Sequence, residues 1–92
     1  MGTAIVTLKI MPESPQTDLA AIESAATKKI SAWTGKDAHK SEVEPIAFGL
    51  KALKIMFPVD EAKGGTEPLE ADISSIRGVE SVSVVDVRRA IG

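Results

Sequence analysis

The sequence predicts an α+β fold in which two helices cover one face of a four-stranded antiparallel sheet. Four segments alternate residue types with the two-residue period of a β-strand. Two further segments repeat apolar residues every three or four positions, as amphipathic helices do. Their order along the chain is βαββαβ, that of a split βαβ arrangement in which right-handed crossovers place both helices on the same side.

Length and composition agree with this architecture. Single hydrophobic cores usually comprise about 50 to 200 residues, so we expect one domain spanning residues 1–92. Hydrophobic residues make up 43% and charged residues 26% of the chain, which is ordinary for a globular protein and argues against disorder or a coiled coil. A core of this size leaves little room for a deep substrate cavity, so a self-contained enzyme is not expected.

The first strand is expected between Thr3 and Met11, with Ala4, Val6, Leu8 and Ile10 on one face. Two prolines then interrupt the chain, because each fixes its own φ and pushes the preceding residue out of the helical region. Thr17 or Asp18 can cap the helix that follows, and Gly35 can end it. The apolar positions of this helix are Leu19, Ile22, Ala26, Ile30 and Trp33.

The next two strands are expected to form a hairpin. Residues Lys40 to Ile46 suit an edge strand, because glutamates and Pro45 block pairing with another chain. Residues Leu50 to Val59 suit an interior strand, because they alternate two largely apolar faces. The core face of this strand would carry Leu53, Ile55, Phe57 and Val59. The short segment Ala47-Phe48-Gly49 must then form a tight turn.

The last third of the chain predicts a loop, a helix and a strand. The loop covers Asp60 to Gly65, and Thr66 caps a helix with Glu67 and Pro68 in its first turn. We expect this helix to end at Arg77-Gly78. The final strand covers Val79 to Val87, with Val82 and Val84 on one face and Val79, Val85 and Val87 on the other. Together these elements predict a ferredoxin-like βαββαβ sandwich.

One sheet face would be free of helices. It is expected to carry the apolar residues Ile5, Met11, Leu50 and Met56 beside Lys9 and Lys54. We interpret it as an ordinary mixed face, with a partner surface as the alternative.

Charge and residue content exclude several function classes. Eleven Lys and Arg against 13 Asp and Glu give a net charge of −2, unlike the basic surface of a nucleic-acid binder. No cysteine and a single histidine, His39, argue against disulfides, iron–sulfur clusters and common zinc sites, so no cofactor is expected. Without a signal peptide or a long apolar run, we expect no membrane partner and a cytoplasmic location.

Catalytic residues are also scarce. His39 has no evident nucleophile beside it, and the carboxylates fall in loops and on exposed helix positions. Gly64-Gly65-Thr66 before a helix could attract an anion, but Glu67 places negative charge there, which favours a capped loop. We therefore predict a protein without covalent chemistry of its own.

Two features remain as candidate partner-binding residues. The chain has three aromatic residues; Trp33 and Phe57 fall on apolar stripes, whereas Phe48 lies in the hairpin turn. Phe48 either folds back onto the sheet end or forms an exposed aromatic anchor, and the pattern leaves both open. The second feature is Asp86-Val87-Arg88-Arg89 at the expected strand end, either a carboxylate-binding pair of arginines or a solvated basic tail.

Four separated motifs carry a family resemblance. They are Met11-Pro12-Glu13-Ser14-Pro15, Glu44-Pro45-Ile46-Ala47-Phe48-Gly49-Leu50-Lys51-Ala52-Leu53, Gly64-Gly65-Thr66-Glu67 and Asp86-Val87-Arg88-Arg89. In order and in register over essentially the whole chain, they resemble the archaeal elongation factor 1-beta family. The segment from Pro45 to Leu53 is similar also to the C-terminal exchange domain of the eukaryotic factor.

The resemblance implies a guanine-nucleotide exchange factor for elongation factor 1-alpha, the GTPase that carries aminoacyl-tRNA to the ribosome, and an α/β sandwich. In that family the phenylalanine that matches Phe48 projects into the GTPase domain and helps displace the elements that hold magnesium and the phosphates. Pro45, Ile46 and Gly49 would shape and aim this loop. From the residue pattern alone, we also expect Asp86, Arg88 and Arg89 to contact the partner.

One family feature has no direct match. In the eukaryotic domain a lysine near the C-terminus reaches toward the magnesium site, whereas this chain ends in Ala90-Ile91-Gly92. Arg88 or Arg89 would have to take its place. The alternative function is a small ligand- or RNA-binding module on the same fold, suggested by the lysines of the helix-free sheet face. RNA modules stack bases on aromatics of the central strands, and only Phe57 is available there, on the core face.

Overall fold

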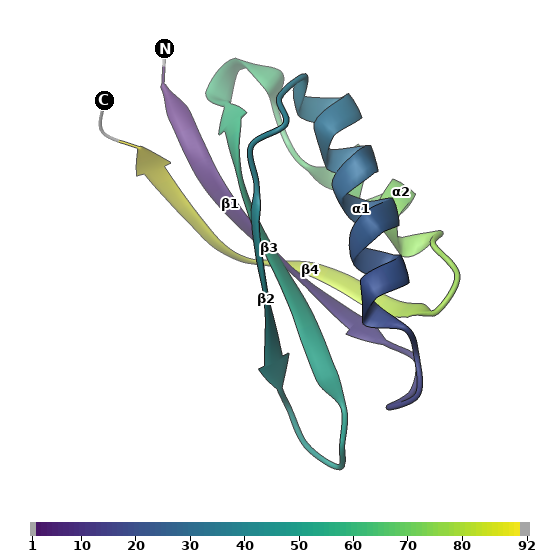
Figure 1. The fold of residues 1–92 in the computed structure, drawn as a ribbon. Helices are drawn as coiled ribbons and strands as arrows, with labels where there is room; N and C mark the ends of the chain where they lie inside the picture. The colour runs from purple at the N-terminus through teal and green to yellow at the C-terminus, as the bar shows by residue number, and fades with distance from the viewer. Residues whose placement is uncertain (1, 91–92) are drawn as a thin grey trace.

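A computed structural model describes residues 2–90 and confirms the predicted α+β fold. The elements are β1 (Thr3–Pro12), α1 (Leu19–Thr34), β2 (Lys40–Pro45), β3 (Lys51–Asp60), the short 3₁₀ helix η1 (Glu61–Lys63), α2 (Glu67–Ser74) and β4 (Val79–Ala90). The strands form an antiparallel sheet in the order β2-β3-β1-β4. Both helices lie on one face of this sheet (Figure 1).

The core lies between the helices and the two central strands. Alternate residues of β1 and β3 turn toward the helices, and Leu8, Ile10 and Ile55 are completely buried. The helices contribute residues at helical spacing, among them Ile22, Ile30 and Ile73. The expected central position of β1 and β3 and the edge position of β2 are confirmed.

Helix α1 begins and ends as predicted. Of the two candidate caps, Asp18 fills the role: its carboxylate accepts hydrogen bonds from the amides of Ala20 and Ala21 at 3.0 and 3.2 Å. Such a cap satisfies amide donors that have no partner within the helix. Gly35 closes the other end with a φ of 75°, in the left-handed region that favours glycine.

Helix α2 is shorter than predicted. It ends at Ser74, before the expected stop at Arg77-Gly78. The hydroxyls of Ser74 and Ser75 donate to carbonyls three residues earlier, and such bonds compete with continued helix formation. Thr66 occupies the N-cap position, but its hydroxyl donates to the Glu70 carboxylate at 2.8 Å and does not cap the helix amides.

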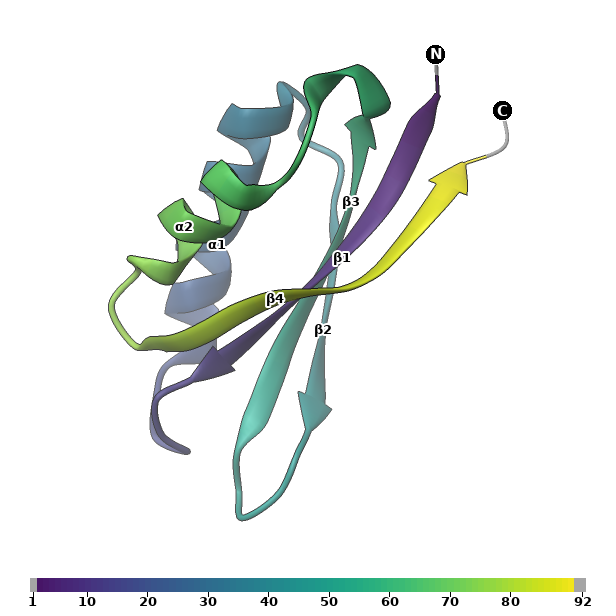
Figure 2. The same ribbon diagram turned by 180° about the vertical axis from the view of Figure 1, so that it is seen from behind.

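Strand β4 is longer than predicted and irregular. Its pairing with β1 shifts register twice: between Met11 and Pro12, where Glu80 is the extra residue, and between Thr7 and Leu8, where Val85 is the extra residue. As a result Val79 and Val87 lie on the helix side with Val82 and Val84, so the predicted placing of Val79 and Val87 on the other face is wrong. Figure 2 shows the second half of β4 extending beyond the helices, which leaves Val87 exposed.

The molecule has two distinct ends. The β2–β3 turn projects at one end of the sheet, well beyond the end of β1 and the start of β4 (Figures 1 and 2). The start of β1, the end of β3 and the end of β4 meet at the other, where Thr3 pairs with Asp60 and with Ala90. Within residues 2–90, neither helix has the length and apolar run that a membrane span requires.

Candidate partner-binding site

The β2–β3 connection is a tight hairpin turn. The Leu50 amide donates to the Ala47 carbonyl at 2.9 Å, and the Ile46 amide donates to the Leu50 carbonyl at 2.9 Å. The two central residues, Phe48 and Gly49, both have positive φ, 54° and 80°. Two successive positive φ values are typical of the type I′ turn, whose twist matches that of antiparallel strands. Leu50, expected on the helix-free sheet face, lies in this turn outside β3.

Phe48 is an exposed aromatic residue at the tip of this turn. Its exposed fraction is 98%, so the interpretation in which the ring folds back onto the sheet is wrong. Among the described residues, Phe48 is also the only non-glycine residue with a positive φ. For a bulky L-residue this backbone region is unfavourable, and such strain clusters at functional sites. The ring is held away from the core at a cost in stability.

The neighbouring predicted residues lie together around Phe48. Pro45 ends β2 and pairs with Lys51, and Ile46 is 40% exposed. Gly49 lies against the β1–α1 loop, since a Cβ on it would stand 3.7 Å from the Cβ of Pro15. Beside this contact, a groove of about 300 Å³ is lined by the loop and by Gly49 and Lys51. Pro45, Ile46, Phe48 and Gly49 thus form one projecting tip.

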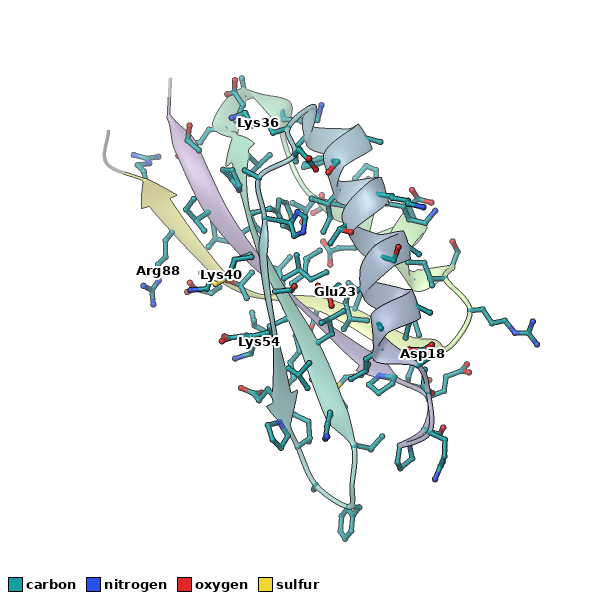
Figure 3. The ribbon with its side chains drawn as sticks, viewed as in Figure 1. Asp18, Glu23, Lys36, Lys40, Lys54 and Arg88 are labelled. Carbon is teal, nitrogen blue, oxygen red and sulfur yellow. The ribbon has the colours of Figure 1, made fainter. Side chains whose placement is uncertain are left out.

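The two predicted arginines lie toward the opposite end of the sheet, whereas Asp86 pairs with Thr7 near its middle. Arg88 and Arg89 lie near the end of β4, paired with Ile5 and Ala4, so the strand-end placement is confirmed and the basic-tail alternative is wrong. Arg88 projects from the sheet on the side away from the helices (Figure 3). Its Nε lies 2.9 Å from Asp86, and the Nε of Arg89 lies 2.8 Å from Glu61.

Both arginine side chains remain largely exposed, 79% for Arg88 and 77% for Arg89. Each can therefore reach a partner without leaving the sheet. Ile91 and Gly92, at the position of the family's C-terminal lysine, lie outside the described residues. Within the described chain no group of three or more His, Cys, Asp or Glu residues is arranged to hold a metal ion.

Sequence reasoning missed an ion-pair cluster beside the turn. The Glu44 carboxylate lies 2.8 Å from the Lys54 ammonium and 3.6 Å from that of Lys9. The hydrogen bond from Lys54 lowers the pKa of Glu44 below its ordinary value of 4.5, and the same bond raises the pKa of Lys54 above 10.5. The alternation of β2 places Glu44 on the helix-free face, but only the strand order shows which lysines it meets.

The chain also matches proteins of known family. Residues 5–90 match the family described as the EF-1 guanine nucleotide exchange domain. The chain belongs to this family. Three archaeal relatives, all named Elongation factor 1-beta, match this chain over nearly their whole length.

The relative from Methanothermobacter thermautotrophicus is 47% identical; the match covers 97% of this chain and 98% of the relative. The relative from Methanosarcina barkeri is 48% identical; the match covers 97% of this chain and 99% of the relative. The relative from Methanococcoides burtonii is 42% identical over 99% of this chain and all of the relative. The resemblance to archaeal elongation factor 1-beta is thereby confirmed. It supports a role for this exchange-domain chain in guanine-nucleotide exchange during translation elongation.

A solved structure titled BlrP1 BLUF shares the fold. It superposes with a TM-score of 0.55 at 14% identity over the whole of this chain, which spans 57% of that chain. At this identity the likeness concerns the fold alone, because one fold hosts many functions.

Proposed function

We propose that this exchange-domain chain accelerates GDP release from elongation factor 1-alpha by inserting Phe48 into the GTPase domain. The observation that carries the proposal is the 98% exposure of this ring at a strained turn. A rigid aromatic side chain buries a large area for little loss of conformational freedom, and aromatic anchors dominate many interfaces. Pro45, Ile46 and Gly49 hold the ring in its outward direction.

No covalent step is needed. A factor that binds the nucleotide-free GTPase more tightly than the loaded form must weaken nucleotide binding, because the two binding events are linked. Excess GTP then reloads the GTPase and expels the factor. The proposal assigns no acid, base or cofactor to this chain, and it places the chain in the cytoplasm, where elongation takes place.

Asp86, Arg88 and Arg89 form a second proposed contact. Arg88 and Arg89 lie toward the end of the sheet opposite Phe48, and Asp86 pairs with Thr7 near the middle of the sheet. A partner that touches both Phe48 and the arginines would have to span much of a molecule that is 42 Å long. These residues would strengthen association and orient the chain, because exposed charges steer binding.

The RNA-binding alternative has less support. Lys9 and Lys54 on the helix-free face are both paired with Glu44, which offsets part of their charge. The aromatic ring of β3 is Phe57, and it is 1% exposed, so it offers no stacking surface. A strongly salt-dependent affinity for RNA would support the alternative over exchange.

The test measures release of a fluorescent GDP from elongation factor 1-alpha by stopped flow. We expect catalytic amounts of this chain to accelerate release, and Phe48→Ala to abolish most of the effect while the circular dichroism spectrum is unchanged. Lys36→Ala is the matched control, since it truncates another exposed loop side chain at the opposite end (Figure 3). Equal rates for the wild type and Phe48→Ala would refute the proposal.

A further inference from the structure

The direction of Phe48 depends on the strands that carry it. Its ring is almost fully exposed, so contacts of the ring itself do not hold it. One of the two supporting strands, β2, is an edge strand that pairs with β3 alone. On the helix side β2 is tied to α1 by a hydrogen bond from the Ser41 hydroxyl to the Glu23 carboxylate.

On the opposite side of β2, Glu44 ties three strands together. It lies directly before Pro45, at the base of the turn, and its two carboxylate oxygens meet Lys54 of β3 and Lys9 of β1. The residue opposite Glu44 on β3 is Ala52, which is completely buried. A small side chain at this position leaves room for the carboxylate to cross β3 and reach β1.

The neighbouring glutamate of the same face behaves differently. Glu42 stands directly opposite Lys54 in the pairing of β2 with β3. The Lys54 ammonium nevertheless contacts Glu44, 2.8 Å away. The ion pairs therefore gather at the base of the turn, on the segment whose direction decides where Phe48 points.

We propose that Glu44 is a positioning residue for nucleotide exchange: its contacts with Lys54 and Lys9 fix the angle of the β2–β3 turn and thereby aim Phe48. The inference rests on the proposed function of Phe48. The three side chains are 27 to 40% exposed, and partly exposed ion pairs contribute little to stability. Their effect is on direction, because a ring that enters the partner at a changed angle buries less area.

The test compares Glu44→Gln with Glu42→Gln, which removes the same charge from the same face of the same strand. At saturating factor, we expect Glu44→Gln to lower the maximal rate of GDP release about three- to tenfold, since small misplacements of a reacting group lower rates strongly. Glu42→Gln is expected to remain within about twofold of the wild type, as surface charges usually do. Lys54→Gln should lower the maximal rate of GDP release in the same way, whereas Lys54→Arg should retain it, because arginine keeps the positive charge that pairs with Glu44.

A double-mutant cycle separates aiming from any other role. If Glu44 acts through Phe48, Glu44→Gln has no further effect in a Phe48→Ala background, because the two effects are then strongly non-additive. Independent, multiplying effects would overturn the inference, since Glu44 would then act by another route. Lys9→Gln breaks only the longer contact and provides a milder variant, for which we expect a smaller loss with the same dependence on Phe48.

The outcomes also separate this inference from the function it rests on. A wild-type rate for Glu44→Gln, together with a large loss for Phe48→Ala, overturns the positioning role and leaves the proposed function standing. A wild-type rate for Phe48→Ala overturns the proposed function itself. Salt provides a further readout: the gap between the wild type and Glu44→Gln should narrow as ionic strength rises, because salt screens partly exposed pairs.

Discussion

Replacing Phe48 with glycine should change stability and activity in opposite directions. The residue has a φ of 54°, a region that L-residues avoid and glycine adopts freely. Its side chain is 98% exposed, so its removal deletes almost no packing. The substitution therefore relieves backbone strain while removing the ring proposed to enter the partner.

The stability gain follows from two opposing contributions. A left-handed L-residue costs about 1–2 kcal/mol, whereas the added freedom of glycine in the unfolded chain costs about 0.5–1 kcal/mol. The difference is a gain of about 0.5–1 kcal/mol, which raises the melting temperature of a domain of this size by about 2–8 °C. Phe48→Ala keeps the strain, so its melting temperature should stay close to that of the wild type.

The loss of activity follows from the area of the ring. A phenylalanine buries about 150–250 Å² at an interface, an upper limit of about 4–6 kcal/mol at 25 cal/mol/Å². Ordering and desolvation offset part of this, and truncation of interface anchors typically costs about 2–4 kcal/mol. The exchange efficiency should therefore fall by about 30- to 700-fold, at 1.4 kcal/mol for each factor of ten.

Two measurements test this reasoning on the same samples. Calorimetry gives the melting temperatures of the wild type, Phe48→Ala and Phe48→Gly, and stopped-flow GDP release gives their exchange efficiencies. We expect both variants to lose exchange and only Phe48→Gly to gain stability. A lower melting temperature for Phe48→Gly would refute the strain argument, and retained exchange in both variants would refute the role of the ring.

Three further predictions concern other parts of the chain. Phe57→Ala should lose about 3–5 kcal/mol in the free energy of unfolding measured with urea, since Phe57 is 1% exposed and its removal leaves a cavity; a loss under about 1 kcal/mol would contradict its place in the core. Asp18→Ala should lose about 1 kcal/mol in the same assay through its helix cap, with GDP release unchanged; altered release at equal folding would instead place Asp18 at the interface. The contribution of the Glu44–Lys54 pair should be constant between about pH 5 and pH 10. The contribution should fall in acid as pH drops through the lowered pKa of Glu44, and in alkali as pH rises through the raised pKa of Lys54. The measurement is the difference in melting temperature between the wild type and Glu44→Gln. A difference that varies between about pH 5 and pH 10 would contradict the pairing of Glu44 with Lys54.

Regular elements could be predicted because their signals are local. The alternation of β1 and β3 identifies the core-facing residues correctly, and the positions of Asp18 and Gly35 mark both ends of α1. Side-chain direction along a strand or helix follows from backbone period alone. The early end of α2 was missed because serine hydroxyls near Ser74 compete for the helix carbonyls, which apolar spacing does not reveal.

The faces of β4 could not be predicted, for a related reason. A single extra residue at Val85 reverses the alternation for the rest of the strand. Valine is compatible with both faces and with a bulge, so the choice depends on how β1 pairs with β4. The strand also runs past its expected end at Val87, because Arg88 and Arg89 continue the pairing with β1.

For the candidate site too, some features could be predicted from contiguous residues and others depend on contacts between distant segments. Residue content and motifs alone pointed to a partner-binding role and to Phe48 in a tight turn, because turn chemistry and family motifs reside in contiguous residues. Only the tertiary structure decided that the ring faces solvent, that Arg88 lies at the opposite end, and that Glu44 reaches Lys9 across a third strand. Each of these three observations depends on which strands pair and in which register. The packing of the whole sheet against its helices sets that pairing and register.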